Sequence, residues 1–221
     1  MAITINGSAN TIAGLAVGGL PDGTVDADTL AASSVTDAKI TAVSSSKLSG
    51  ALPAISGASL TGLSGGIDGY DMWRLTSNLT GNQLPITTGD LERVDDATSV
   101  KIGTGMSVSS GVFSFPNTGI WRVTWGASVE SDVDTHQNVF TIEVTSNNSS
   151  YDTTARTRQG IYKMSTGTSY GSATTSCIVD VTDTSNVKVR FEFIDGQGDG
   201  ILQGDTDGNQ TTFEFIRLGD T

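Results

Sequence analysis

Four aspartates in one glycine-rich stretch are the side chains of this sequence best suited to hold a metal ion. Within residues 195–209 they are Asp195, Asp199, Asp205 and Asp207. Carboxylate oxygens are the ligands that calcium prefers, so calcium is the one cofactor that the sequence suggests. The stretch is not a complete EF-hand. With Asp205 at position one, position six is Gln210 instead of glycine and position twelve is Ile216 instead of glutamate. This mismatch favours the alternative, a solvated loop without a metal.

The sequence offers little for catalysis. His136 is the only histidine, which excludes zinc sites built from several histidines and leaves at most one Ser/His/Asp arrangement. No G-x-S-x-G or phosphate-loop motif accompanies it. Glycoside cleavage needs two facing carboxylates, and nothing in the spacing of the 24 acidic residues singles out such a pair. We expect residues 134–138 to form a polar turn between two strands, and we expect no enzymatic activity.

Two tyrosines in polar sequence are candidates for contact with a receptor. Tyr151 lies in the run NNSSYDT and Tyr170 in the run GTSYGS, so we expect both in loops. A tyrosine exposed at a loop can stack on a sugar, because its ring is apolar on both faces and polar at its tip. The alternative is a ring that packs on the end of a strand at the edge of the solvent.

Charge and hydropathy argue against several classes of partner, and the single cysteine excludes a disulfide within the chain. With 24 acidic and 12 basic residues the net charge is −12, which argues against nucleic acid and anionic membranes as partners. Cys177 is the single cysteine, so it cannot form a disulfide within the chain, and its run TSCIVDV is typical of a buried strand. No apolar run reaches the ~18 residues of a membrane span. The first residues lack the charged start of a signal peptide.

From residue 70 onward, short apolar runs alternate with turn sequences. We expect short strands near residues 70–75, 91–94 and 100–102, a strand, a corner and a long strand within residues 111–130, and further strands at 139–145, 154–163, 176–182, 187–194 and 211–218. In residues 187–194, valine and phenylalanine alternate with charged residues, which is the period of a half-buried strand. About eight to ten strands with almost no helical periodicity predict an all-β fold, a β-sandwich.

Two of these runs resemble a known family. The first run has the pattern F-x5-G-x-W-x-V, formed by Phe113, Gly119, Trp121 and Val123. It resembles the F-x5-G-x-Y-x-F signature of the trimeric jelly-roll heads of the tumour necrosis factor and complement superfamily, with Trp for Tyr and Val for Phe. Residues 212–216 (TFEFI) resemble the closing strand of those heads. The resemblance implies a jelly-roll β-sandwich and a homotrimer. Ile216 points away from the phenylalanines of its strand, so we expect Ile216 and Leu218 to pack on a neighbouring subunit.

Residues 1–66 differ from the rest of the chain because they contain no Phe, Trp or Tyr. Such a segment has little to bury, so we place the domain boundary at the small-residue hinge 63–66, with a globular domain at residues 67–221. Pairs of aliphatic residues recur in it: Val25 with Leu30, Val35 with Ile40, Val43 with Leu48, and Ile55 with Leu60. A unit with two modest apolar groups needs neighbours, which favours an intertwined stalk. The alternative is a flexible linker. Its secondary structure, single helical turns or short extended pieces, stays open.

This N-terminal segment also resembles the repeat segments near the N-termini of tail fibres and related virion proteins of tailed bacteriophages. The phrases VTDAKI and LPAISGASLTGL carry the resemblance. It implies a virion protein, made in the host cytoplasm, that binds other virion proteins through residues 1–66 and presents a trimeric head to a glycan or protein of the host surface. The alternatives are a head-decoration or baseplate protein that binds only other virion proteins, and a polysaccharide depolymerase.

Overall fold

The computed structural model describes residues 4–6, 11–13 and 66–221. The chain divides into two units, Met1–Leu60 and Thr61–Thr221, and the second is termed the head below. In the first unit, β1 (Thr4–Asn6) and β2 (Thr11–Ala13) pair antiparallel. The stalk and repeats expected in residues 1–66 otherwise lie outside the described residues, so their arrangement stays a prediction.

The described part of the head is built from strands and one short 3-10 helix. In chain order the elements are β3 (Tyr70–Leu75), β4 (Leu79–Thr80), η4 (Thr88–Asp90), β5 (Leu91–Arg93), β6 (Ser107–Ser109), β7 (Val112–Ser114), β8 (Gly119–Ser131), β9 (Thr135–Thr145), β10 (Asp152–Ile161), β11 (Ser169–Val181), β12 (Lys188–Asp195), β13 (Ile201–Leu202) and β14 (Thr212–Gly219). The all-β prediction is therefore confirmed.

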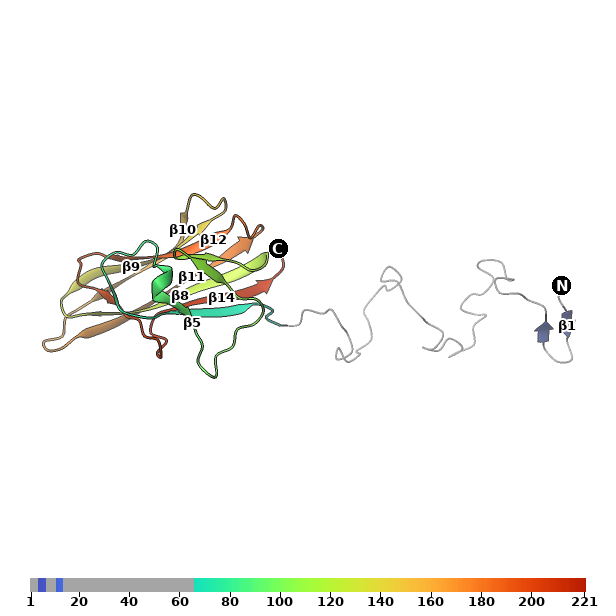
Figure 1. Cartoon of the computed structure of the whole chain (residues 1–221), viewed down its shortest axis with the longest axis horizontal. Helices are drawn as coiled ribbons and strands as arrows, with labels where there is room; N and C mark the ends of the chain where they lie inside the picture. Colours follow the sequence, from blue (N-terminus) through green and yellow to red (C-terminus); the bar gives the residue numbers. More distant parts are fainter. Residues whose placement is uncertain (1–3, 7–10, 14–65) are drawn as a thin grey trace. The chain divides into compact units, whose positions relative to one another are not determined.

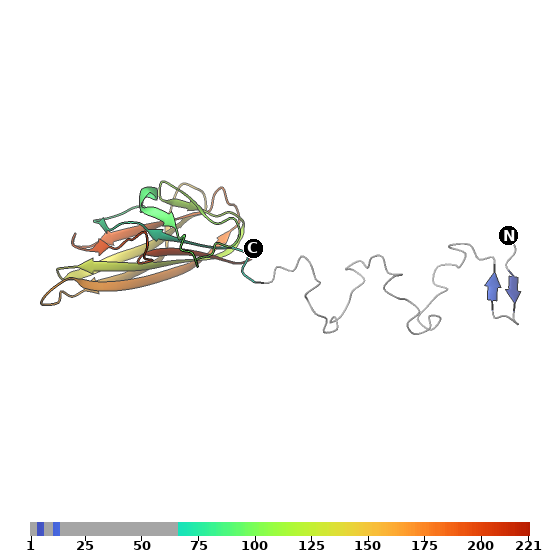
Figure 2. The same ribbon diagram turned by 60° about the horizontal axis from the view of Figure 1, so that its bottom comes forward.

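Two antiparallel sheets are stacked face to face in the head (Figures 1 and 2). The five-stranded sheet has the order β10-β9-β12-β7-β6. The seven-stranded sheet has the order β4-β13-β8-β14-β3-β5, and β11 pairs with β8. The chain passes repeatedly from one sheet to the other, which sets β14 between β8 and β3 and sets β12 between β9 and β7. This strand order is that of a jelly roll, so the jelly-roll β-sandwich is confirmed.

The core lies between the sheets and is built from alternate residues of the long strands. On β8, Trp121, Val123 and Trp125 are each at most 1% exposed, because odd-numbered residues of this strand face inward. Phe191 of β12 and Phe213 of β14 meet with ring centroids 4.5 Å apart. The two sheets are thus joined by large aromatic side chains, whose burial contributes about 25 cal/mol per Å² of apolar surface.

The predicted corner before β8 is present, and the backbone at position 119 explains why the corner needs a glycine. Gly119 has φ 134°, and a Cβ there would lie 2.5 Å from the carbonyl oxygen of Gly219. Only glycine fits this close approach of β8 to β14. The signature residue Phe113 on β7 is wholly buried and packs edge to face on Phe191.

Several predicted elements are wrong. The strand expected near residues 100–102 is absent, and Ile102 forms only an isolated bridge with Tyr70. β9 begins at Thr135, so residues 134–138 are not simply a turn between strands. β11 begins at Ser169 rather than near residue 176 and pairs with β8 over its whole length. Residues 195–209 are not one loop, because β13 lies within them and pairs with β4 and β8. In the last three cases pairing with a neighbouring strand outweighs a local sequence that is polar or rich in Gly.

The described part of the head begins and ends at the same end, termed the near end (Figures 1 and 2). Arg217 of β14 joins these segments: it forms ion pairs with Asp68 and Asp220 and donates to the carbonyl oxygen of Thr118 (3.0 Å). The opposite end, termed the far end, carries the connections from β8 to β9, from β10 to β11 and from β12 to β14.

Candidate functional site

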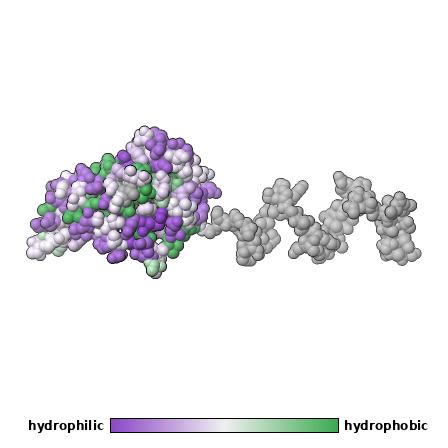
Figure 3. Space-filling model, in the orientation of Figure 1, coloured by the Kyte–Doolittle hydropathy of each residue, from purple (hydrophilic) through white to green (hydrophobic). Residues whose placement is uncertain are grey.

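The outer face of the seven-stranded sheet carries apolar side chains that no described part of the chain covers completely. Register places Tyr70, Ile216, Arg122 and Ile178 in one row across β3, β14, β8 and β11. Ile178 is 55% exposed and Leu218 is 56% exposed. The outer apolar face comprises Tyr70, Met72, Ile120, Ile178, Ile216 and Leu218. The side of the head seen in Figure 3 is mostly hydrophilic, with small hydrophobic areas.

Ile216 lies on the side of β14 that faces away from the core, as predicted. Its neighbours in the sheet are Tyr70 and Arg122, whereas Phe215 pairs with Val123, which faces the core. Even so, Ile216 is only 9% exposed, because the longer side chains on either side flank it. Leu218 follows at a register shift of β14 and is left open to solvent.

A pocket of about 460 Å³ opens at the edge of this face, beside β3. Its apolar lining comes from Tyr70, Met72, Val94, Val100 and Ile102. The Tyr70 hydroxyl donates to the Met72 sulfur at 3.4 Å. Burial, reinforced by the negative charge of Glu214, raises the pKa of Tyr70, so the phenol stays protonated and does not serve as a base. The pocket is suited to an apolar side chain rather than to acid–base chemistry.

A buried carboxylate holds the pocket wall in place. Asp71, with none of its surface exposed, accepts from Arg93 Nε (2.8 Å) and Nη2 (3.1 Å), from Trp73 Nε1 (2.9 Å) and from the amide of Met106 (2.7 Å). Four donors on one carboxylate compensate for its removal from water. A Cβ on Gly105 would lie 2.8 Å from Asp71 Oδ2, so this turn has room only for glycine.

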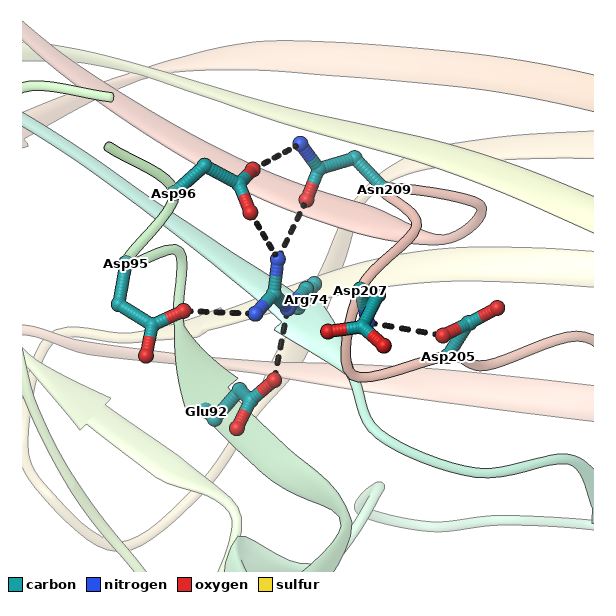
Figure 4. A network of polar contacts seen from close by, with 7 residues as sticks. All are labelled: Arg74, Glu92, Asp95, Asp96, Asp205, Asp207 and Asn209. Carbon is teal, nitrogen blue, oxygen red and sulfur yellow. Dashed lines mark hydrogen bonds and ion pairs between the residues drawn. The ribbon is translucent and has the colours of Figure 1, made fainter. Parts of the chain in front are cut away.

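Arg74 forms a second network on the other side of β3 (Figure 4). Its guanidinium is 3% exposed and forms ion pairs with Glu92 (2.7 Å), Asp95 (2.7 Å) and Asp96 (3.1 Å). Burial acts to lower the pKa of Arg74, but hydrogen bonds to Glu92 and Asp96 outweigh it and raise the pKa above its usual value. Asn209 accepts from Arg74 Nη1 at 3.4 Å and donates to Asp96 at 3.2 Å, which ties residues 205–209 to this network.

Two of the four aspartates suggested for calcium, Asp195 and Asp205, accept hydrogen bonds from nearby backbone amides. Asp195 accepts from the amides of Gly200 (2.9 Å) and Gln197 (3.3 Å), and Asp205 accepts from the amide of Asp207 (2.8 Å). Figure 4 shows Asp205 and Asp207 in contact with each other, in the same loop as Asn209, the residue that bonds to Arg74. Within residues 66–221 and the two short N-terminal strands, no group of three or more His, Cys, Asp or Glu side chains could hold a metal ion.

The two receptor-contact candidates lie far from each other in the fold. Tyr151 precedes β10 and its ring lies under the guanidinium of Arg190 at 4.0 Å, so it packs on the five-stranded sheet. Tyr170 is 66% exposed, but it lies within β11 and pairs with Glu130 of β8, not in a loop as expected. The structure therefore does not bring the two tyrosines into one site.

The histidine and the cysteine have ordinary structural settings. His136 lies exposed on β9, and its amide donates to Gln197 at 2.7 Å. Cys177 lies on β11 against the core, where burial raises the pKa of its thiol to about 11. A thiol with so high a pKa is almost wholly protonated at neutral pH, so it is a poor nucleophile.

Comparisons with known proteins found similar solved structures but no related sequence family. The sequence matches no protein family and no curated protein. Among solved structures, the chain is similar to murine APRIL, with a TM-score of 0.47 and 12% identity over 67% of this chain and 99% of that one. It is also similar to Eiger TNF from S. frugiperda, with a TM-score of 0.46 and 11% identity over 69% of this chain and 93% of that one. The strand order given above is what establishes the jelly roll. Among the described residues, no helix is both long and apolar enough to span a membrane.

Proposed function

We propose that this chain is a structural protein of a bacteriophage virion, a tail fibre or spike, and that it is not an enzyme. In this proposal residues 1–66 bind other virion proteins and form the stalk. The head forms a homotrimer that contacts a glycan or protein of the host surface. The observation that carries the proposal is the outer apolar face, because aliphatic and aromatic side chains gathered on neighbouring strands favour a surface that another protein covers.

A second copy of the same chain is the simplest partner for this face. The outer apolar face and the adjoining pocket are complementary in character, since the pocket has an apolar lining and Ile178 and Leu218 project from the face. Repeated use of one such contact closes a ring of identical subunits. Three subunits are favoured because the sequence resembles trimeric jelly-roll heads and because the repeats of the first unit need neighbours from other chains.

The assignment to a virion is based on the N-terminal phrases VTDAKI and LPAISGASLTGL, which resemble those of tail fibres. Such a protein is made in the host cytoplasm and becomes part of the particle. Contact with the host is proposed for the head, because exposed connections on a rigid scaffold carry recognition in many folds. Three heads on one stalk strengthen a weak contact through multivalency.

Sedimentation equilibrium and labelling of particles test this function together. The purified full chain is expected to have three times its chain mass of 22.8 kDa. Antibodies raised against the head are expected to label the tail of purified particles, and the purified protein is expected to bind host cells. A monodisperse monomer, or particles without label, would contradict the proposal.

The same measurements separate the alternatives. A head-decoration or baseplate protein would place the label on the capsid or baseplate, and the purified protein would not bind host cells. A depolymerase would shorten host polysaccharide, which chromatography of the treated polysaccharide by size would detect. The proposal expects no change in polysaccharide length.

A further inference from the structure

Arg158 is an arginine without an acidic partner in a strongly acidic protein. All seven arginines of the sequence lie in the described part of the head, and the other six each form an ion pair: Arg74, Arg93, Arg122, Arg156, Arg190 and Arg217. Within residues 66–221, the Arg158 side chain has neither an ion pair nor a hydrogen bond. Since acidic residues outnumber basic ones 24 to 12, an unpaired guanidinium is unexpected.

The register of the five-stranded sheet explains why Arg158 is unpaired. Arg158 of β10 pairs with Val139 of β9, which pairs in turn with Ile194 of β12. On the solvent side of the five-stranded sheet, this row of residues therefore offers no carboxylate to the Arg158 guanidinium. The next row toward the near end does offer one, because Arg156 lies across Thr141 from Glu192. The five N–H donors of Arg158 are left free for a ligand, over an apolar base.

An exposed aromatic ring and a second cation follow directly after β10, which ends at Ile161. Tyr162 is 86% exposed. Lys163 follows it and is also exposed. The carboxylate of Asp134 also lies near Lys163. It accepts a hydrogen bond from the Lys163 amide at 2.5 Å, so it is already bound to the backbone. Arg158, Tyr162 and Lys163 thus lie within a short stretch of the chain and supply two positive charges and one exposed aromatic ring.

We propose that Arg158, Tyr162 and Lys163 form a binding site for an anionic saccharide, with Arg156 at its border. The guanidinium binds a carboxylate or phosphate group through paired hydrogen bonds, the ring of Tyr162 stacks on the apolar face of a sugar, and Lys163 adds charge. Charge complementarity selects this ligand, since the site gathers cations on an otherwise acidic surface. The inference rests on the proposed attachment function and names its ligand.

This site is separate from the outer apolar face. Arg158 lies on the outer side of the five-stranded sheet, whereas the outer apolar face belongs to the seven-stranded sheet on the opposite side of the sandwich. Three copies that meet through the outer apolar face would therefore keep three saccharide sites open. It also differs from both tyrosines singled out in the sequence, since Tyr151 is stacked under Arg190 and Tyr170 lies on β11.

Binding of the full chain to immobilised oligosaccharides tests the site. The probes are oligogalacturonate, which carries carboxylates, a phosphorylated oligomannose, and neutral dextran as the uncharged reference. We expect binding to at least one acidic probe and none to dextran. Arg158→Ala and Tyr162→Ala should each weaken binding about tenfold or more, the size of effect typical of central arginine and tyrosine contacts. Both side chains are exposed, so melting temperature and subunit mass should stay unchanged.

Lys188→Ala is the matched control, because Lys188 is a cation of the same sheet at the near end of β12 and donates to the carbonyl oxygen of Thr184 (2.6 Å). It should leave the affinity unchanged. No binding to either acidic probe, equal binding to dextran, or unchanged affinity in both site variants would overturn the site.

Binding to host cells separates this inference from the proposed function. If wild-type protein binds host cells and Arg158→Ala binds them equally well, the saccharide site is wrong while attachment stands. If wild-type protein does not bind host cells at all, the attachment function itself fails. Binding that is lost after protease treatment of the cells but survives periodate oxidation of their sugars would point to a protein receptor and would also overturn the saccharide site.

Discussion

The two sheets of the head share one aromatic core but differ on their outer faces. On the five-stranded sheet, charges of opposite sign face each other across the strands, as in Arg190 with Glu143 (2.7 Å) and Arg156 with Glu192 (4.0 Å). The seven-stranded sheet carries aliphatic side chains such as Ile178 instead, with Arg122 and Glu214 (3.2 Å) among them. Because side chains alternate along a strand, the core determines only one side of each sheet. The other side is free to suit solvent, a ligand or another subunit.

The sheets also differ in where they place ion pairs. Beside β3 of the seven-stranded sheet, Asp71 and Arg74 are almost wholly buried, and each holds a loop in place. The ion pairs of the five-stranded sheet are only partly buried, and they join strands that backbone hydrogen bonds already connect, directly for Arg190 with Glu143 and through β9 for Arg156 with Glu192. Buried pairs are costly to break, whereas exposed ones contribute little. The loops that frame the pocket should therefore depend on ion pairs, and the five-stranded sheet should not.

Replacing Asp71 should give the largest effect. Asp71→Ala leaves Arg93, the Trp73 indole N–H and the Met106 amide without their acceptor, and we expect the free energy of unfolding to fall by about 3–5 kcal/mol. Urea denaturation followed by tryptophan fluorescence would measure it. A loss below about 1 kcal/mol would mean that the cost of burying Asp71 cancels the benefit of its hydrogen bonds.

A charge on the outer apolar face should separate the subunits. Ile178→Asp places a carboxylate where the proposed trimer is dry, so we expect the sedimentation mass to fall toward that of one chain, with association at least about tenfold weaker. Thr154→Asp, on the exposed side of β10, is the control and should keep the mass of the trimer. Equal masses for the two variants would show that the face is not the contact.

Removing a partly buried ion pair of the five-stranded sheet should have the smallest effect. Glu143→Ala breaks the pair with Arg190, whose partners are 12% and 24% exposed, and because backbone hydrogen bonds still join β9 and β12 we expect a loss of about 1 kcal/mol in unfolding free energy that shrinks in 1 M salt. Arg190 keeps its contact with the ring of Tyr151. The same urea denaturation at low and high salt would measure the change. A loss above about 2 kcal/mol would remove the distinction drawn here between the two sheets.

Much of the fold could be predicted from local patterns. The alternation in residues 187–194 and the run from Phe113 to Val123 placed β12, β7 and β8 correctly, since inward and outward positions follow directly from the period of a strand. Strands rich in Ser, Thr and Gly were predicted poorly. The first half of β11, with Ser169 and Tyr170, has no apolar period and is a strand because β8 lies beside it.

The candidate sites could be predicted only in part. An aliphatic residue on the outward side of its strand, Ile216, was enough to predict an outer apolar face. Nothing local indicated that Asp71 would meet Met106, or that Arg74 would meet Asn209, because these contacts join residues that are distant along the chain. A charged residue within an apolar strand, such as Arg74, was the one available signal of a buried ion pair.

The sequence by itself determined which side chains face the core, that the head is a β-sandwich, and that the chain is acidic with one histidine and one cysteine. These properties depend on composition and on the two-residue period of a strand. Only the tertiary structure decided which strands lie side by side and in which register. The register places Arg156 near Glu192 but places Arg158 opposite Val139. The guanidinium of Arg158 is therefore free to bind a ligand.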